Sequence, residues 1–359
     1  MDKYTKIKIK LKFSYILKNR IQLLIRTAGG KAKNKQLGLG HIFRTINLAN
    51  ELQKKFDIHF LIEDFGGVTK ILKDHGFSSV KKIPNNVDLK KDIKYTKKNI
   101  EKNGAAILIV DRFRTKKEYL KKMKSEIKTI LITDLKNIDY HADLLINGFI
   151  GYKNQKFNNK FQTLCIVGPR YQILNSKFQK SKPLRKKFTI LASFGGIDEK
   201  KISELLLDSI EKILPSIKIK LILGPASQKS EKVKEFEKKY PRNLKVQKGA
   251  DNMAKEISQS KFGFCTGGLT TYEFAAMKVP FVMICDDTHQ LITAKEWHKA
   301  KIGINLGLIN KKTKRKIQDV VRKMIISEKI NSNKINFVDG KGVRRINNEI
   351  LKLAKMENS

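Results

Sequence analysis

The chain has 359 residues, of which 40% are hydrophobic, so it is long enough for two folded domains and its composition excludes global disorder. It carries 76 lysines and arginines against 34 acidic residues, a formal net charge of +42 that favours anionic partners. The excess is mostly lysine spread along the whole chain, so a compositional origin stays open beside a functional one. No sequence signature of specific nucleic-acid binding accompanies the charge.

The three cysteines, Cys165, Cys265 and Cys285, lie in or at the end of apolar runs without ligand spacing. We therefore expect reduced core residues and neither a disulfide framework nor a zinc site. The sequence has no run of about 18 apolar residues that would predict a membrane-spanning helix, and no cleavable signal pattern. We expect a cytoplasmic protein that needs no metal or other cofactor.

Residues 1–20 form a basic extension in which apolar residues alternate with lysines. An edge strand, a disordered arm and a surface that touches anionic lipid all fit this pattern. From residue 21 to 178, short apolar runs alternate with amphipathic stretches of helical period. The expected strands are Leu23–Ile25, Ile58–Ile62, Ile107–Val110, Thr129–Thr133, Leu144–Ile146 and Cys165–Val167. The expected helices are Phe43–Lys55, Val68–His75, Ile93–Glu101 and Lys116–Lys124.

Residues 176–187 are polar and basic and are predicted to be a linker. The alternation then begins again over residues 179–335, and residues 336–359 are expected to form a C-terminal helix. The second set of strands is Phe188–Ala192, Ile217–Leu223, Leu244–Gln247, Phe262–Cys265, Phe281–Ile284 and Ile304–Leu306. The second set of helices is Glu199–Ile213, Glu231–Lys239, Ala254–Gln259, Thr271–Met277, Ala294–Lys299, 311–330 and Val343–Lys355.

Short continuous apolar strands separated by helices predict parallel sheets covered on both faces. The fold class is therefore α/β, with two doubly wound, Rossmann-like domains. We expect the carboxyl ends of both sheets to face a shared cleft, which is where such sheets bind ligands.

The first candidate segment is Gly38-Leu39-Gly40-His41, which follows a predicted Gly- and Lys-rich loop from Ala28 to Gln36 and opens a helix. Gly38 and Gly40 allow close approach of the backbone to a ligand, and the free amides of the helix start favour an anion. His41 could exchange a proton there. A histidine that only satisfies local backbone groups is the structural alternative.

The second half offers two glycine pairs at strand ends. Gly195 and Gly196 fit either a tight turn or an amide nest for phosphate. Gly267 and Gly268 precede a helix at which Thr270 and Thr271 could cap the amides or bind a diphosphate. Glu273 could accept hydrogen bonds from ribose hydroxyls, although Thr270 and Glu273 also fit a capping box.

Two further segments follow strands. Asp286-Asp287 lacks a third carboxylate at ligand spacing, so a solvated loop is expected rather than a metal site, with His289 and Gln290 available for sugar hydroxyls. Asn252 and Met253 could lie beside a base. Among the other histidines, His59 and His75 are expected to be structural, and His141 is a candidate for the cleft.

Taken in order, these segments resemble a known family. Gly-x-Gly-His-x-x-Arg, Ser-Phe-Gly-Gly-x-Asp and Gly-Gly-x-Thr-x-x-Glu are similar to motifs of the UDP-sugar hydrolase of pseudaminic acid biosynthesis and of the related spore-coat polysaccharide glycosyltransferases. The resemblance covers roughly residues 21–355. Further segments in the family's order are Val110–Phe113, Ile132–Asp134, Ala142–Asn147, Tyr171–Leu174 and Asp339–Ile346.

The family is similar to GT-B glycosyltransferases, including the one that forms lipid II. The resemblance implies a UDP-sugar substrate, with uracil near Asn252 and Met253, ribose on Glu273 and diphosphate over 267–271. It also implies that the sugar projects toward His41, with Arg44, Asp111 and Phe113 nearby. Two departures concern the sugar side: Phe113 lacks the hydroxyl of the family's tyrosine, and the family's Asn-Gln pair is His289-Gln290 here.

The sequence thus predicts a UDP-sugar hydrolase that inverts the anomeric carbon, with His41 as general base for water, in nonulosonic acid or surface polysaccharide synthesis. An inverting GT-B glycosyltransferase is the alternative, in which an acceptor hydroxyl replaces water. A third hypothesis is a non-catalytic basic protein that binds nucleic acid or an anionic membrane, whose binding would be steeply salt-dependent and independent of His41. The sugar, the acceptor and the oligomeric state are not specified by the sequence.

Overall fold

The computed structural model describes residues 20–32, 35–113, 115–134, 136–180, 184–224, 227–326 and 338–355, and for 31–37 and 180 it describes the backbone alone. The predicted basic extension 1–20 lies, apart from Arg20, outside the described residues. The chain divides into two compact units. Unit 1 comprises residues 1–146, 156–166 and 346–359, and unit 2 comprises residues 147–155 and 167–345.

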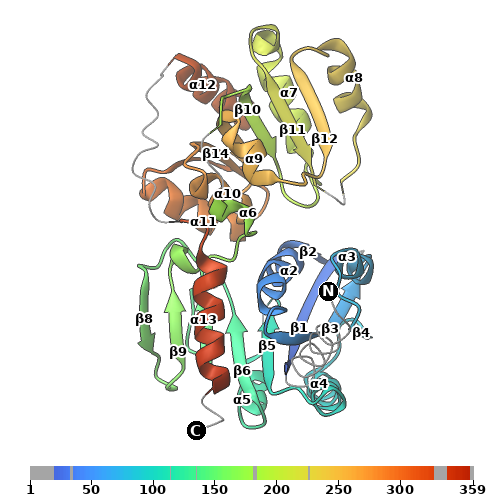
Figure 1. Cartoon of the computed structure of the whole chain (residues 1–359). Coiled ribbons are helices and arrows are strands. Elements are labelled where there is room, and N and C mark those ends of the chain that lie inside the picture. The colour runs from blue at the N-terminus through green and yellow to red at the C-terminus, as the bar shows by residue number, and fades with distance from the viewer. Residues whose placement is uncertain are drawn as a thin grey trace, which may run out of the picture. The chain divides into compact units, whose positions relative to one another are not determined.

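The sheet of unit 1 has the strand order β4-β3-β1-β5-β6-β7-β9-β8, with β2 paired to β1 (Figure 1). The strands β1, β3, β4, β5, β6 and β7 pair in parallel, and β2 is antiparallel to β1. The order runs outward from β1 in two directions, so the sheet is doubly wound. The strands are β1 Ile21–Ala32, β2 Lys35–Gly38, β3 Phe56–Phe65, β4 Val80–Ile83, β5 Ile107–Asp111, β6 Lys128–Ile132, β7 Leu144–Asn147, β8 Gln155–Asn158 and β9 Leu164–Val167.

The helices of unit 1 cover both faces of this sheet. Arg26 of β1 reaches Asp92 on one helix, whereas Gly29 of the same strand packs against Ile42 on another. Because positions 26 and 29 differ by an odd number, their side chains point to opposite faces. The helices are α2 Gly40–Leu52, α3 Val68–Asp74, α4 Leu89–Asn103 and α5 Lys117–Lys124.

The predicted loop from Ala28 to Gln36 is wrong. β1 continues to Ala32 and pairs antiparallel with β2, with Gly30 opposite Gly38. Gly30 has φ +111° and lies directly against the backbone of Phe65, which explains a glycine inside a paired strand. The edge strands β4 and β8 were also not predicted, because Val-Lys-Lys-Ile and Gln-Lys-Phe-Asn contain few apolar residues.

Unit 2 contains a parallel sheet of order β12-β11-β10-β13-β14-β15, again wound outward in two directions from its first strand. The strands are β10 Phe188–Ser193, β11 Ile219–Leu223, β12 Leu244–Lys248, β13 Ser260–Cys265, β14 Phe281–Cys285 and β15 Gly303–Leu308. The helical segments are η1 Pro169–Tyr171, α6 Lys177–Lys180, α7 Ile202–Ile210, η2 Glu211–Ser216, α8 Glu231–Lys239, α9 Met253–Ser258, α10 Leu269–Ala276, α11 Thr288–Lys299 and α12 Thr313–Ile326.

Alternate residues of β10 enter two different cores. Ile190 and Ala192 pack in one cluster with residues of α7, α8 and α12, and Leu191 packs in the other with residues of α9, α10 and α11. Both faces of the sheet are therefore covered, as the continuous apolar strands predicted. The fold class of two Rossmann-like α/β domains with parallel sheets is confirmed.

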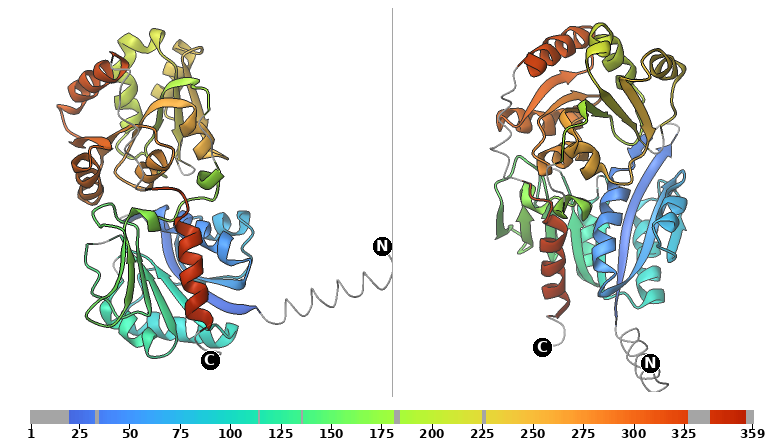
Figure 2. Two further views of the ribbon diagram at one scale, coloured as in Figure 1. Left: turned by 60° about the vertical axis from the view of Figure 1, so that its left-hand side comes forward. Right: turned by 45° about the horizontal axis from the view of Figure 1, so that its top comes forward.

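The predicted linker at 176–187 lies in unit 2. Phe178 of α6 is 5% exposed and joins the core cluster of α9–α11, so one buried aromatic residue anchors an otherwise polar segment. The last helix, α13 Gly342–Lys355, ends in unit 1, where Glu349 accepts a hydrogen bond from Lys156 of β8 at 2.6 Å (Figure 2). Within the described ranges, no helix combines the length and apolar character needed to cross a membrane.

Candidate active site

His41 lies in the first turn of α2, immediately after the β1–β2 hairpin. Gly38 adopts φ +60°, which favours glycine, and no side chain caps the helix. A Cβ placed on Gly38 or Gly40 would meet no described atom within 4 Å. The backbone before His41 therefore borders open space, as the sequence predicted.

His41 and Arg44 converge on one buried carboxylate, Asp111, at the end of β5. His41 Nδ1 lies 2.7 Å from Asp111 Oδ1. Arg44 holds both oxygens, through Nε to Oδ2 at 2.8 Å and through Nη2 to Oδ1 at 2.5 Å. Asp111 is 0% exposed, and such bidentate, charge-assisted contacts are strong and fix geometry.

The electrostatics of this cluster favour an ionised Asp111. Burial alone would raise the pKa of its carboxyl, but the Arg44 guanidinium and then His41 outweigh this and hold the pKa below its usual value. Burial would lower the pKa of Arg44, whereas Asp111 and Asp134 raise it above its ordinary value. Asp111 is therefore a carboxylate and Arg44 a cation at neutral pH.

This carboxylate selects the tautomer of His41. An ionised carboxylate only accepts hydrogen bonds, so the proton of a neutral His41 belongs on Nδ1, where it donates to Asp111 Oδ1. Arg44 Nη2 lies 2.9 Å from the same Nδ1 and donates to Asp111 Oδ1. Nε2 then carries a lone pair. A histidine oriented in this way by a buried aspartate can act as a general base.

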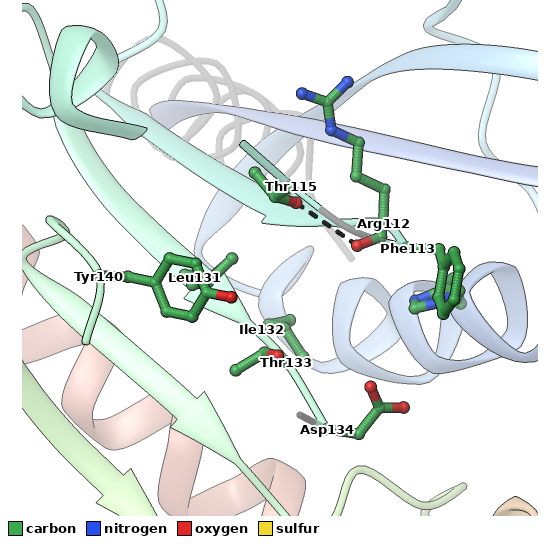
Figure 3. Close-up of a pocket in the computed structure, with 9 residues that line it drawn as sticks. Arg112, Phe113, Thr115, Leu131, Ile132, Thr133, Asp134 and Tyr140 are labelled. Atoms are coloured by element: carbon green, nitrogen blue, oxygen red, sulfur yellow. Dashed lines mark hydrogen bonds between the residues drawn. The ribbon is translucent and has the colours of Figure 1, made fainter. Parts of the chain in front are cut away.

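A narrow pocket adjoins His41. It encloses about 10 Å³, close to what one water molecule needs, and its lining includes Phe113, Thr115, Thr133, Asp134 and Tyr140. Figure 3 shows the Tyr140 hydroxyl pointing into the pocket, and the Arg112 guanidinium pointing away while its carbonyl accepts a 3.4 Å hydrogen bond from Thr115.

Most residues of this pocket were not selected as site residues from the sequence, among them Thr115, Asp134 and Tyr140. Asp134 follows β6, the neighbour of β5, and its carboxylate lies 3.4 Å from Arg44 Nη1. Its position directly after a buried strand was the available signal. Tyr140 is 7% exposed and lies in a loop without such a signal. The ring of His141, by contrast, stacks on Phe161 with 3.9 Å between the ring centres, and His141 is not among the residues that line this pocket.

In unit 2 both glycine pairs lie where the strand order reverses, at the carboxyl ends of β10 and β13. Gly195 has φ +82°, and a Cβ on Gly195 or Gly268 would lie 3.9 Å and 3.8 Å from Thr266 Oγ1. Both glycines therefore lie near Thr266. Ligands bind at this position of doubly wound sheets.

The two glycine segments are held by close backbone contacts. A Cβ on Gly267 would lie 2.2 Å from the carbonyl oxygen of Gln290, so only glycine fits there. The carbonyls of Gly195 and Gly196 approach Gly224 at the end of β11 as closely, at 2.2 and 2.3 Å from a Cβ placed on Gly224. The loops after β10, β11, β13 and β14 thus form one packed edge.

The alternative of a capping box formed by Thr270 and Glu273 is wrong. The N-cap is Gly268, no side chain caps the helix, and Thr270 lies inside the first turn. Thr271 is 0% exposed; its hydroxyl donates to the Gly268 carbonyl at 2.7 Å and accepts from Trp297 Nε1 at 2.8 Å. Its side chain therefore packs in the core instead of facing a ligand.

Glu273 lies one turn into α10 and is partly exposed. Burial raises the pKa of its carboxyl to about 7, against an opposing hydrogen bond from Thr270. An uncapped helix start with a nearby glycine pair is suited to a phosphate. When it is ionised, the Glu273 carboxyl, one turn further along α10, can accept hydrogen bonds from hydroxyl groups.

The expected loop holds for Asp286 and Asp287, which precede α11, whereas Thr288, His289 and Gln290 form the first turn of that helix. Asp287 is the N-cap and accepts from the Gln290 amide at 2.7 Å, and Gln290 Oε1 accepts from the Asp286 amide at 3.3 Å. His289 is partly exposed in the same turn. Within the part of the chain that the structure describes, no three His, Cys, Asp or Glu residues gather as a metal site.

Asn252 and Met253 begin α9 after β12. Asn252 is the N-cap of α9, and its side-chain oxygen accepts a hydrogen bond from the Lys255 amide at 3.1 Å. That oxygen is therefore used to cap the helix. Met253 is partly exposed. The predicted segments of unit 2 thus lie along one sheet edge, with the Thr271 side chain turned into the core. In unit 1, His41 and Phe113 line one pocket, and Asp111 and Arg44 contact His41.

Comparison with known proteins agrees with this architecture. Residues 189–350 match the glycosyltransferase family 28 C-terminal domain. The chain is 28% identical over 282 residues to the spore coat polysaccharide biosynthesis protein SpsG of Bacillus subtilis (strain 168), covering 76% of this chain and 80% of SpsG. It is 29% identical over 266 residues, 69% of this chain, to the uncharacterized protein MJ1062 of Methanocaldococcus jannaschii, and spans about half (53%) of that protein's length.

Two solved structures share the fold of nearly the whole chain. MurG from Acinetobacter baumannii matches with a TM-score of 0.64 at 15% identity, covering 92% of this chain and 99% of MurG. The UDP-GlcNAc 2-epimerase from Neisseria meningitidis bound to UDP-GlcNAc matches with a TM-score of 0.59 at 10% identity, covering 92% of this chain and all of that one.

The fold and the matches define an enzyme of GT-B architecture. Its C-terminal half is similar to a glycosyltransferase family 28 domain, and the chain as a whole is similar to SpsG. The resemblance inferred from the sequence is confirmed for the fold and for the similarity to SpsG.

Proposed function

We propose that the chain transfers a sugar from a UDP-sugar to an acceptor hydroxyl with inversion at the anomeric carbon. The observation that carries this proposal is the buried Asp111–His41 pair, which leaves Nε2 of His41 as a proton acceptor beside a pocket lined with hydroxyl groups. The glycosyltransferase family 28 match and the name of SpsG support transfer better than the hydrolysis inferred from the sequence.

The proposed reaction is a single displacement. His41 Nε2 removes the proton of the acceptor hydroxyl, whose oxygen attacks the anomeric carbon on the side opposite UDP. The bond between that carbon and the β-phosphate oxygen breaks, and its electron pair leaves with UDP. Asp111 stabilises the imidazolium that forms, since the Nδ1 proton stays hydrogen-bonded to a buried carboxylate.

In this proposal, unit 2 binds the nucleotide. The amides at Gly267 and Gly268 and the uncapped start of α10 would hold the diphosphate and stabilise the charge that develops on UDP. Glu273 would accept hydrogen bonds from the ribose, and uracil would lie near Met253. A structural neighbour described as a Staphylococcus aureus MnaA–UDP structure, with a TM-score of 0.60, supports a nucleotide site in this fold.

In unit 1, the pocket beside His41 would orient the nucleophile. Tyr140, Thr115 and Thr133 offer hydroxyl groups, and Tyr140 supplies there a phenol that Phe113 lacks. These groups can accept or donate to the hydroxyls of a sugar acceptor. Tyr140 is therefore a positioning residue for the acceptor in this proposal.

Hydrolysis is the second candidate. The volume enclosed beside His41, about 10 Å³, is close to that of one water molecule, and the same base would activate water without any change in the site. The products then differ only in where the sugar goes: to free sugar in hydrolysis and to a glycoside in transfer.

Proton and phosphorus NMR of the protein with UDP-N-acetylglucosamine and other UDP-amino sugars tests both candidates. UDP with a new glycoside that forms only with acceptor supports transfer, and UDP with free sugar formed at the same rate without acceptor supports hydrolysis. Isothermal titration with UDP is the companion measurement. No binding near millimolar UDP would exclude both and leave the non-catalytic hypothesis.

A further inference from the structure

A basic groove of about 510 Å³ lies in unit 2 at the amino-terminal ends of β10, β11 and β12, three strands that lie side by side in Figure 1. None of the described residues that line it is acidic. Six are cationic, and all six are exposed: Arg185, Lys186, Lys187, Lys218, Arg242 and Lys245.

Some lysines elsewhere in unit 2 are paired with carboxylates. Lys229, Lys232, Lys234 and Lys239 each lie within 2.8 Å of a carboxylate oxygen. In the described part of the chain, none of the six groove cations forms an ion pair with a carboxylate. Six clustered cations without a carboxylate partner make the groove a local concentration of uncompensated charge.

The groove also has apolar surface. Its floor includes the buried side chains of Ile219 and Leu244 and the half-buried Phe188. Leu184, directly before Arg185, is 40% exposed and is one of the few large apolar side chains at the surface. An exposed leucine beside clustered cations is the combination by which peripheral proteins hold an anionic bilayer.

We infer that this basic groove is a docking surface for the phosphate groups of an anionic lipid bilayer. Among the described residues, Phe188 is the one aromatic residue that lines it, and Lys220 Nζ lies 5.8 Å from the centre of its ring. Single-stranded nucleic acids need several exposed aromatic platforms for stacking, so the observations favour lipid phosphate over a polynucleotide.

The groove is separate from the proposed nucleotide site. The glycine pairs follow the carboxyl ends of the strands, whereas the groove lies at their amino ends. The five residues of β11 alone place these edges roughly 16 Å apart. Docking on a bilayer would therefore leave the nucleotide edge of unit 2 accessible, and variants of the groove should not change UDP binding.

Sedimentation with vesicles tests this inference. The wild-type chain should bind vesicles of phosphatidylcholine mixed with an equal amount of phosphatidylglycerol, should not bind phosphatidylcholine alone, and should be released by salt. Each cation lost near an anionic leaflet weakens binding about fivefold, so the combined variant Lys218→Gln, Arg242→Gln and Lys245→Gln should bind on the order of a hundredfold more weakly.

The matched control removes three exposed lysines that have carboxylate partners, Lys54→Gln, Lys70→Gln and Lys234→Gln. It changes the net charge equally and should bind vesicles nearly as the wild type does. Equal loss in both triple variants would overturn the inference, because total charge would then explain the binding. Tighter binding of the wild type to an oligonucleotide than to vesicles, lost in the groove variant, would overturn it in favour of a polynucleotide.

Both triple variants should bind UDP like the wild type. This measurement separates failure of the docking inference from failure of the proposed function, which predicts UDP binding whether or not vesicles bind. Thermal unfolding of the variants gives the check that they are folded.

Discussion

Replacing Asp111 by asparagine is the most informative change to the His41 pair. Asparagine keeps the shape but not the charge, and its amide hydrogens can donate to Nδ1, which would move the histidine proton to Nε2 and remove the base. The same change in a serine protease triad lowers kcat about 10,000-fold, and we expect a fall of about a thousandfold or more here.

Asp111→Asn should also destabilise the fold. Arg44 would remain buried with Asp134 as its carboxylate partner. Asp134 Oδ2 lies 3.4 Å from Arg44 Nη1, and the Asp134 side chain is 40% exposed. Breaking a buried pair by removing one partner costs about 3–5 kcal/mol, and the remaining amide oxygen places the expected loss at the lower end. Denaturant unfolding measures this loss, and release of UDP from a UDP-sugar measures kcat.

Asp92→Asn is the matched control for stability. Asp92 is 4% exposed and holds two arginines, Arg26 at 3.0 Å and Arg112 at 2.5 Å, but it does not line the pocket. It should lose similar stability and keep most of kcat. If Asp111→Asn, folded at the assay temperature, turned over substrate as fast as Asp92→Asn, the assigned role of the carboxylate would be refuted.

Acid unfolding gives a second test of Asp111. Its pKa is lower in the folded chain than in the unfolded one, so ionisation stabilises the protein above the unfolded value of about 3.9. This contribution is lost as the pH falls through the folded value. Stability of Asp111→Asn should therefore fall less steeply than that of the wild type below about pH 4.

Four further changes test the nucleotide edge and the glycines. The carboxyl of Glu273 has a pKa of about 7, whereas the diphosphate of a UDP-sugar does not titrate near neutrality, so affinity for a UDP-sugar should rise with pH through that value. Glu273→Gln should remove this pH dependence. If the variant kept the same dependence, the ribose contact would be contradicted. Thr271→Val leaves Trp297 Nε1 without its acceptor and should cost about 1–3 kcal/mol in unfolding experiments without raising KM; a specific KM increase would instead make Thr271 a ligand. Gly267→Ala should disrupt unit 2, because the added methyl group would clash with Gln290. Gly40→Ala should fold normally and raise only KM. An unchanged melting temperature for Gly267→Ala, or an unchanged KM for Gly40→Ala, would count against these assignments.

Tyr140→Phe tests the acceptor pocket. Loss of the hydroxyl should raise KM for the acceptor with little change in KM for the UDP-sugar, because Tyr140 lines the pocket of unit 1 and not the nucleotide edge. Steady-state kinetics with each substrate varied in turn measure the two constants. Equal changes in both would show that Tyr140 acts through the fold rather than on the acceptor.

The sequence was sufficient for the repeated strand–helix order, because the buried strands are continuous apolar runs that differ in period from the helices. It failed where composition and pairing disagree. In the Gly- and Lys-rich segment, β1 extends to Ala32 and pairs with β2, and Gly30 packs there against Phe65, a contact that is not local in sequence. The edge strands β4 and β8 bury little surface, so their apolar pattern is weak.

The candidate site was predictable to the extent that it follows strand ends. His41 and Asp111 each follow or end a strand next to the point where the strand order reverses, and both were selected. Thr271 was assigned to ligand because a hydroxyl at a helix start often binds one; its bond to Trp297, 26 residues away, could not be read from the sequence. Tyr140 enters the pocket from a loop, where no periodic pattern indicates direction.

The central claim is that His41 is the base that activates the nucleophile in UDP-sugar chemistry. The direct measurement is the rate of UDP release by the wild type, by His41→Gln and by the control His75→Gln. The imidazole of His75 lies 2.8 Å from the Ile71 carbonyl and packs edge-on against Phe43. We predict that His41→Gln binds UDP like the wild type and turns over about a hundredfold to ten-thousandfold more slowly, while His75→Gln keeps its rate. Full turnover by His41→Gln would contradict the account.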